Sequence, residues 1–221
     1  MSNHPFLFDR INRLKADVAR FQYVIYAYET TDYSRYPENF EKLGLEVAMK
    51  AEAIACSTRD IVSTLPSIGK KRTLLAAADA QGIKIEKRPF GYEIVMPGLM
   101  TKRDDRSNVP FLLEPLSYAL DEFARKEMIE RYDQALVWFI YEYADDTPAR
   151  HIRDYDNIES KEVLDMINAF FLLDDGGDFC QLHYSSCRGE RDCTRIIISP
   201  DICLISCLDR EENRHIFSAY V

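Results

Sequence analysis

Residues 135–143 read ALVWFIYEY, a run of bulky and β-branched side chains with one charge near its end. Nine residues are few for a helix, and this composition is typical of strands. The run therefore predicts a buried β-strand, and the other elements are predicted outward from it.

Short elements are expected on both sides of this strand. Before it, alternation of apolar and polar residues predicts a β-hairpin over 83–96. A helix is expected over 114–130, with Leu116, Leu120, Phe123 and Met128 inside. After the strand we expect, in order, a turn at 145–148, an extended segment at 151–156, a helix at 158–171, a turn at 174–177, and strands at 179–185 and 194–199.

The first 80 residues have the period of amphipathic helices instead. Apolar residues step by three and four along a first helix, at Ile11, Leu14, Val18, Phe21, Ile25 and Tyr28. A polar turn and a second helix over 37–64 complete an antiparallel hairpin, and a third helix is expected over 70–80. The predicted fold class is α+β, with a helical region at 1–80. An α/β domain with a small mixed sheet and two packed helices is expected at 81–221. The apolar seam of the first helix is expected to serve core or dimer packing.

The charge of the chain is strongly uneven. Its 221 residues have a net charge of -9. Residues 1–80 contain 11 Lys and Arg against 10 Asp and Glu, and the remainder contains 17 against 27. This acidity argues against non-specific nucleic-acid binding, which depends on neutralising phosphates. No apolar run approaches the roughly 18 residues of a membrane span, and the charged first twenty residues lack a secretory signal, so we expect a cytoplasmic protein without membrane contact.

The six cysteines have two interpretations. Cys180, His183, Cys187 and Cys193 are residue types that bind zinc, and they follow one another within 14 residues. However, alternation along a strand places Cys180 and His183 on opposite faces. Without a secretory signal, reduced and mostly buried thiols are the better prediction.

Acidic residues gather around the helix predicted at 158–171. Asp154 and Asp156 precede it, and Asp174 and Asp175 follow it. In an extended segment the first two side chains point the same way. Carboxylates that converge are stable around a hard divalent cation such as Mg²⁺, which promotes phosphodiester hydrolysis by activating water.

The same residues also have a purely structural interpretation. Asp156 and Glu159 match a capping box, in which Asp156 would only cap the helix. Lys161 and Asp165 would then be an ordinary surface pair, and the DDGG sequence at 174–177 a turn. Both interpretations stay open at this point.

A family resemblance adds to the first interpretation. The matching residues are Asp154-Tyr-Asp156-Asn157, then Lys161 and Asp165, then Asp174-Asp175. This pattern resembles the signature of the RusA-type Holliday junction resolvases, which are small dimeric endonucleases of bacteria and phages. The likeness covers roughly residues 83–200, and the expected order of elements is similar too.

The resemblance implies specific roles. Asp154, Asp156 and Asp175 would hold Mg²⁺ (or Mn²⁺), with Asp174 beside them, and Lys161 would be the functional lysine. It also implies branched DNA as substrate and a homodimer. One departure is that three residues separate Asn157 from Lys161 where the family has two, and one residue rotates a helical side chain by about 100°.

Two functions are therefore expected. The first is a metal-dependent endodeoxyribonuclease, with catalytic Asp154, Asp156, Lys161 and Asp175. Its DNA would contact a basic rim formed by Arg150, Arg153, Arg188 and Arg191. The alternative is a RusA-like binding module with weakened chemistry, which binds a protein or nucleic-acid partner within a phage or mobile element. A structural protein whose acidic motif only caps and turns is a third interpretation. The whole chain is also similar to an uncharacterised family of mobile-element proteins.

Overall fold

A computed structural model describes residues 5–98, 109–129, 131–149, 152, 154–155, 158, 160–174, 176 and 178–200. The chain divides into two compact units, Met1–Ala76 and Ala77–Val221. The first unit is helical. The second contains the sheet, and the fold class is α+β as predicted.

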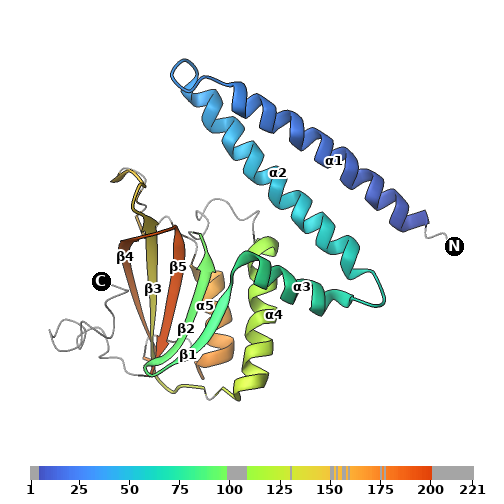
Figure 1. The fold of residues 1–221 in the computed structure, drawn as a ribbon. Helices are drawn as coiled ribbons and strands as arrows, with labels where there is room; N and C mark the ends of the chain where they lie inside the picture. Colours follow the sequence, from blue (N-terminus) through green and yellow to red (C-terminus); the bar gives the residue numbers. More distant parts are fainter. Residues whose placement is uncertain are drawn as a thin grey trace. The chain divides into compact units, whose positions relative to one another are not determined.

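The first unit is a helical hairpin. Helix α1 (Pro5–Thr30) runs antiparallel to α2 (Pro37–Ser63), as the sequence predicts (Figure 1). Pro37 occupies the first turn of α2, where a missing N–H costs nothing. The rings of Tyr28 and Phe40 pack 4.4 Å apart between centroids, close to the turn. These contacts join the two helices where the chain reverses.

The apolar seam of α1 divides into two stripes. Leu14, Phe21 and Tyr28 are partly buried. The intervening Ile11, Val18 and Ile25 remain exposed, at 36%, 37% and 40%. The hairpin leaves one of the two stripes exposed. Core packing therefore does not account for the whole seam, and the alternative expectation, dimer packing, stays a prediction.

The second unit is a five-stranded mixed sheet. Its strands are β1 (Lys84–Arg88), β2 (Gly91–Pro97), β3 (Ala135–Ala144), β4 (Cys180–Gly189) and β5 (Cys193–Ser199). They are arranged in the order β1-β2-β5-β3-β4, with β3 and β4 parallel and every other pair antiparallel. The run that predicted a buried strand is β3, whose first nine residues are all buried.

Two helices cover one face of this sheet, α4 (Val109–Glu127) and α5 (Lys161–Phe171) (Figure 1). The main core lies between them and the strands. It includes Phe139, Tyr141 and Ile196, together with Leu116 of α4 and Phe171 of α5. A third helix, α3 (Gly69–Gln81), spans the division between the units and contributes Ala78 to this core. We call this side of the sheet the helix-covered face.

The other side, here the second face, contains a smaller apolar cluster. Leu136, Trp138, Ile140 and Ile197 are buried there. The same face also presents charged residues of β1, β2, β3 and β5, because side chains alternate along each strand. The second face is therefore partly apolar and partly ionic.

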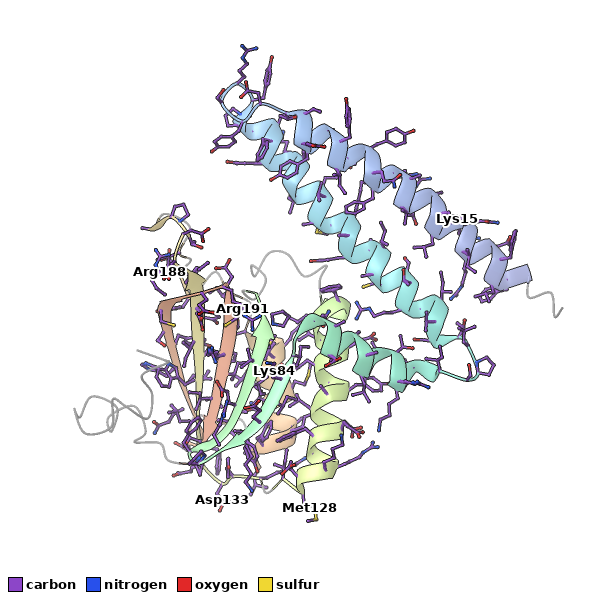
Figure 2. The ribbon with its side chains drawn as sticks, viewed as in Figure 1. Lys15, Lys84, Met128, Asp133, Arg188 and Arg191 are labelled. Carbon is purple, nitrogen blue, oxygen red and sulfur yellow. The ribbon has the colours of Figure 1, made fainter. Side chains whose placement is uncertain are left out.

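Three local details differ from expectation. Helix α4 ends at Glu127, and Met128 has a positive φ of 46° and is 84% exposed (Figure 2), so its expected place in the core is wrong. Ile152 and Asp154 belong to no regular element and Tyr155 lies in a 3₁₀ turn, so the expected strand over 151–156 is not formed by its described residues. Gly91 has a φ of 135°, and a methyl group there would overlap the Ile198 carbonyl oxygen, so this position of the hairpin requires glycine.

No helix among the described residues is both long and apolar enough to span a membrane.

Candidate functional site

The acidic motif begins in the connection between β3 and α5. Asp154 is exposed there, and the next residue, Tyr155, is held against the helix-covered face. The Tyr155 ring stacks on Tyr141 and Tyr184, with centroids 6.0 and 5.9 Å away. Its hydroxyl accepts a hydrogen bond of 3.3 Å from Ser186 Oγ. An aromatic anchor on β3 and β4 thus fixes the neighbour of Asp154 while leaving the carboxylate exposed.

Lys161 is the first residue of α5 and is exposed. Ser160 occupies the N-cap position, and its hydroxyl lies 3.1 Å from that of Tyr184. The helix therefore begins three residues later than the predicted start at 158. Asp156 and Glu159, the two residues of the predicted capping box, lie outside the described residues. The extra residue before Lys161 lies in the connection and does not rotate the lysine around the helix.

Asp174 follows α5 and is engaged in a turn. Its Oδ1 accepts a hydrogen bond of 3.1 Å from the Gly176 N–H. The Gly176 carbonyl in turn accepts from the N–H groups of Phe179 and Cys180, at 2.8 and 3.0 Å. This is the turn predicted from the DDGG sequence, and it leads directly into β4.

The structure does not bring Asp154 and Asp174 into one cluster. Asp174 lies in the turn just before β4, whereas Tyr155 contacts Ser186, six residues into that strand. Six residues of strand span roughly 20 Å. Among the described residues no group of three or more His, Cys, Asp or Glu side chains is arranged to hold a metal ion. The predicted ligands Asp156 and Asp175 lie outside the described residues.

Two of the four arginines of the predicted basic rim, Arg188 and Arg191, are among the described residues. Arg188 donates from Nη1 to the carbonyls of Ala144 and Thr147, at 3.0 and 2.6 Å, and so holds the turn after β3 (Figure 2). Arg191 is exposed between β4 and β5 and lines a pocket on the second face. Arg150 and Arg153 lie outside the described residues.

The cysteines behave as buried thiols. Cys180 and Cys193 are buried, Cys187 is partly buried, and these three and Cys56 are free thiols. Cys180 pairs with Ala135 and His183 with Trp138, positions on opposite faces of β3. None of these four described cysteines forms a disulfide, and the reduced state stays a prediction.

An ion-pair network on the second face was not predicted. Glu93 on β2, which is 1% exposed, binds Arg88 at 2.8 Å and Arg195 at 3.2 Å. Arg195 on β5 also donates from Nε to Glu142 on β3, at 2.9 Å. Arg195 therefore lies between two carboxylates from the strands on either side. The available signal was that each of these three otherwise apolar strands contains one charged residue at an inner position.

The electrostatics of this network centre on Arg195. Burial alone would lower the pKa of its guanidinium. The hydrogen bond to Glu142 and the nearby negative groups outweigh burial and raise that pKa above its ordinary value. Arg195 is therefore permanently charged, as its two carboxylate partners require.

Burial, together with a hydrogen bond to Glu142, raises the pKa of the Cys193 thiol to about 11. Cysteines of the unfolded chain titrate near 8.5 to 9. As the pH rises, the unfolded state therefore loses this proton at a lower pH than the folded state does. The free energy of unfolding should fall between about pH 9 and 11, by roughly 2 to 3 kcal/mol. Urea unfolding at several pH values, followed by the fluorescence of Trp138, measures this loss.

Cys193→Ala should have a flatter stability profile above pH 9, while Cys56→Ala should keep the wild-type slope as the matched control. Equal slopes for Cys193→Ala and wild type would contradict the assignment of this titration to Cys193.

Comparison with known proteins completes the description. The model of a family described as "Family of unknown function (DUF6100)" matches residues 3–217. A search of curated proteins finds no match to the chain.

Proposed function

The chain belongs to DUF6100, a family of unknown function, and we propose that it is a Mg²⁺-dependent, structure-selective DNA endonuclease resembling the RusA-type resolvases. One observation carries this proposal. The acidic residues of the motif lie in the two connections on either side of α5, between the parallel strands β3 and β4. Strand, acidic connection, helix, acidic connection and strand follow in the order that the resemblance implies.

The donor set suits the proposed metal. Carboxylate oxygens are the ligands that Mg²⁺ prefers, and Asp154 and Asp156 would supply them from the connection before α5. The separation of Asp174 from that connection counts against the expected third ligand, Asp175, for the same ion. Asp154 is exposed, and no hydrogen bond or ion pair joins its side chain to another described residue. Asp174 retains one carboxylate oxygen beyond the one bonded to Gly176. A bound Mg²⁺ would lower the pKa of an attacking water and stabilise charge on the phosphate.

The same proposal gives a role to Lys161 and implies a DNA substrate and a homodimer. At the first position of α5, an exposed ammonium would stabilise charge developing on the phosphate or the leaving oxygen. A symmetric homodimer would present two such sites to a branched DNA substrate, one for each cut strand. One observation favours the alternative, a binding module with weakened chemistry. Oδ1 of Asp174 already accepts a hydrogen bond from Gly176 within a turn, so this oxygen is engaged in structure and not in metal binding.

Metal binding tests the proposal before any substrate is known. Wild type should be stabilised by Mg²⁺ or Mn²⁺ in a thermal-shift titration, because a ligand that binds only the folded state stabilises it, by about 2.7 kcal/mol at 100 times its Kd. Asp154→Asn should lose this stabilisation.

Asp146→Asn is the matched control, because Asp146 is an exposed aspartate of the turn after β3 and lies outside the motif. It should respond to metal as wild type does. Equal metal responses in Asp154→Asn and wild type, or no response in wild type, would contradict the metal site and favour the binding module.

A further inference from the structure

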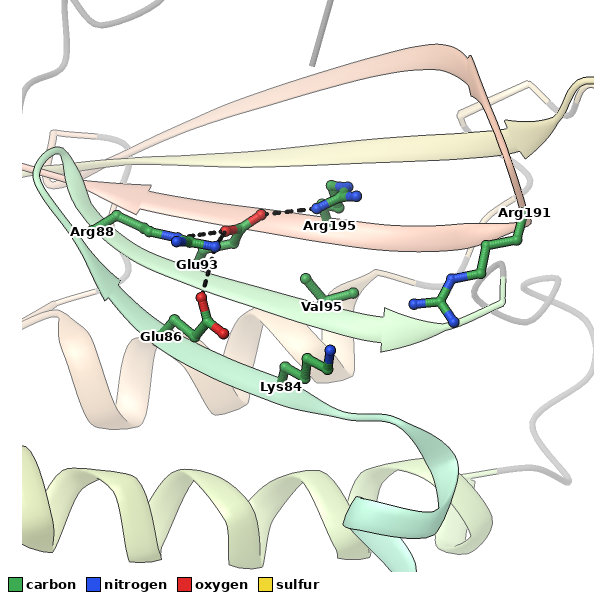
Figure 3. A pocket seen from close by; sticks show the side chains of 7 residues that line it. All are labelled: Lys84, Glu86, Arg88, Glu93, Val95, Arg191 and Arg195. Carbon is green, nitrogen blue, oxygen red and sulfur yellow. Dashed lines mark hydrogen bonds and ion pairs between the residues drawn. The ribbon is translucent and has the colours of Figure 1, made fainter. Parts of the chain in front are cut away.

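A small pocket lies on the second face, beside β1 and β2 (Figure 3). Its volume is about 160 Å³. Four cationic side chains, two carboxylates and one apolar residue line it: Lys84, Arg88, Arg191, Arg195, Glu86, Glu93 and Val95. The lining therefore has a formal excess of two positive charges, which Glu142, bound to Arg195 from outside the lining, lowers to one, in a protein whose net charge is -9.

The carboxylates of the pocket are already matched by arginines. Glu93 binds Arg88 and Arg195, and Glu86 binds Arg88 at 2.6 Å. These bonds hold both arginines in place along the wall of the pocket. The positive excess consequently falls on the remaining two cations, Lys84 and Arg191.

Lys84 and Arg191 are available for a ligand. Within the described part of the chain, no hydrogen bond or ion pair engages either side chain. Figure 3 shows both at the same end of the pocket, with Val95 near Lys84. They come from different elements, since Lys84 begins β1 and Arg191 lies just before β5. An anion bound between these two cations would offset their mutual repulsion.

We propose that this pocket binds a phosphate dianion, either inorganic phosphate or the phosphate of a monoester. The guanidinium of Arg191 matches two phosphate oxygens, and Lys84 supplies a point charge. A phosphate monoester has a charge of about -1.5 to -2 at pH 7, which matches the two positive charges of Lys84 and Arg191. The pocket is smaller than the roughly 300 Å³ of sites that enclose whole drug-sized ligands, so it suits one anionic group.

This site is separate from the proposed nuclease site. Lys84, Val95 and Arg195 point to the second face, in register across β1, β2 and β5. Tyr155, the neighbour of Asp154, stacks on tyrosines of the helix-covered face. The phosphate proposal therefore does not rest on the endonuclease proposal, and its test is carried out without a metal.

Calorimetric titration of the full chain with inorganic phosphate, at low salt and with EDTA, tests the site. Wild type should bind phosphate, and Lys84→Ala with Arg191→Ala should weaken binding by about tenfold or more. The matched control is Lys87→Ala with Arg13→Ala, which also removes two exposed cations. Lys87 lies on β1 facing the other way, and Arg13 lies on α1. This control should bind as wild type does.

Two further arms define the ligand. Binding should weaken from pH 7.5 to 5.5, because the dianion of inorganic phosphate or of a phosphate monoester takes up a proton over this range, while sulfate binding should stay constant. A nucleoside monophosphate that displaces inorganic phosphate would identify monoesters as ligands. If the nucleoside monophosphate does not displace it, the ligand is the free anion. Three results would overturn the proposal: no binding to wild type, undiminished binding to the double variant, or equal binding of a singly charged dinucleotide diester.

Discussion

Replacing Arg195 with methionine is expected to lower the free energy of unfolding of the sheet unit by about 3 to 5 kcal/mol. The substitution removes one arginine partner from Glu93, which is 1% exposed and also binds Arg88, and removes the ion pair of Glu142. Breaking a buried ion pair on one side is costly because the remaining charge is still desolvated. Urea unfolding measures the loss, and Trp138, the only tryptophan of the chain, reports on the sheet unit.

Two further variants separate this effect from a general loss of positive charge. Arg191→Met removes an exposed arginine near the same strand and should change stability by no more than about 0.5 kcal/mol. Adding Glu93→Gln and Glu142→Gln to Arg195→Met should recover part of the lost stability, because no unpaired carboxylate then remains buried. If Arg195→Met and Arg191→Met unfold at the same urea concentration, the network does not contribute to stability.

The network also shows what could not be predicted from the sequence. The strands that contain Glu93, Glu142 and Arg195 were each expected. The first was predicted from alternation of apolar and polar residues, and the second from its short run of bulky and β-branched residues. Their neighbours and register were not, since Glu93 and Arg195 are 102 positions apart. A shift of one residue in register would turn either side chain to the helix-covered face. The charged positions were visible in the sequence, but their pairing depends on long-range strand order.

The acidic motif presents the opposite case. Its positions were singled out because acidic residues gather around the predicted helix, and the family resemblance then gave them roles. The structure changes their surroundings by starting α5 at Lys161 with Ser160 at its N-cap, and by engaging Asp174 with Gly176. The helix was predicted from its apolar positions, which give no information about the exposed residues at its start. Helix ends are decided by local capping and by tertiary contacts such as that between Ser160 and Tyr184.

The endonuclease proposal predicts that wild type cleaves a synthetic four-way DNA junction with Mg²⁺ and that Asp156→Asn does not. Loss of one metal ligand removes several kcal/mol of transition-state stabilisation, which corresponds to at least about a 100-fold lower rate. Denaturing gels of end-labelled junction strands measure the cleavage, and Asp146→Asn should cleave as wild type does. Binding of the junction should weaken steeply as salt is added if the protein contacts DNA phosphates. Binding that does not depend on salt would indicate that the surface around the acidic motif serves a protein partner. Equal cleavage by Asp156→Asn and wild type, or no cleavage by a wild-type protein that binds Mg²⁺, would contradict the proposed catalysis.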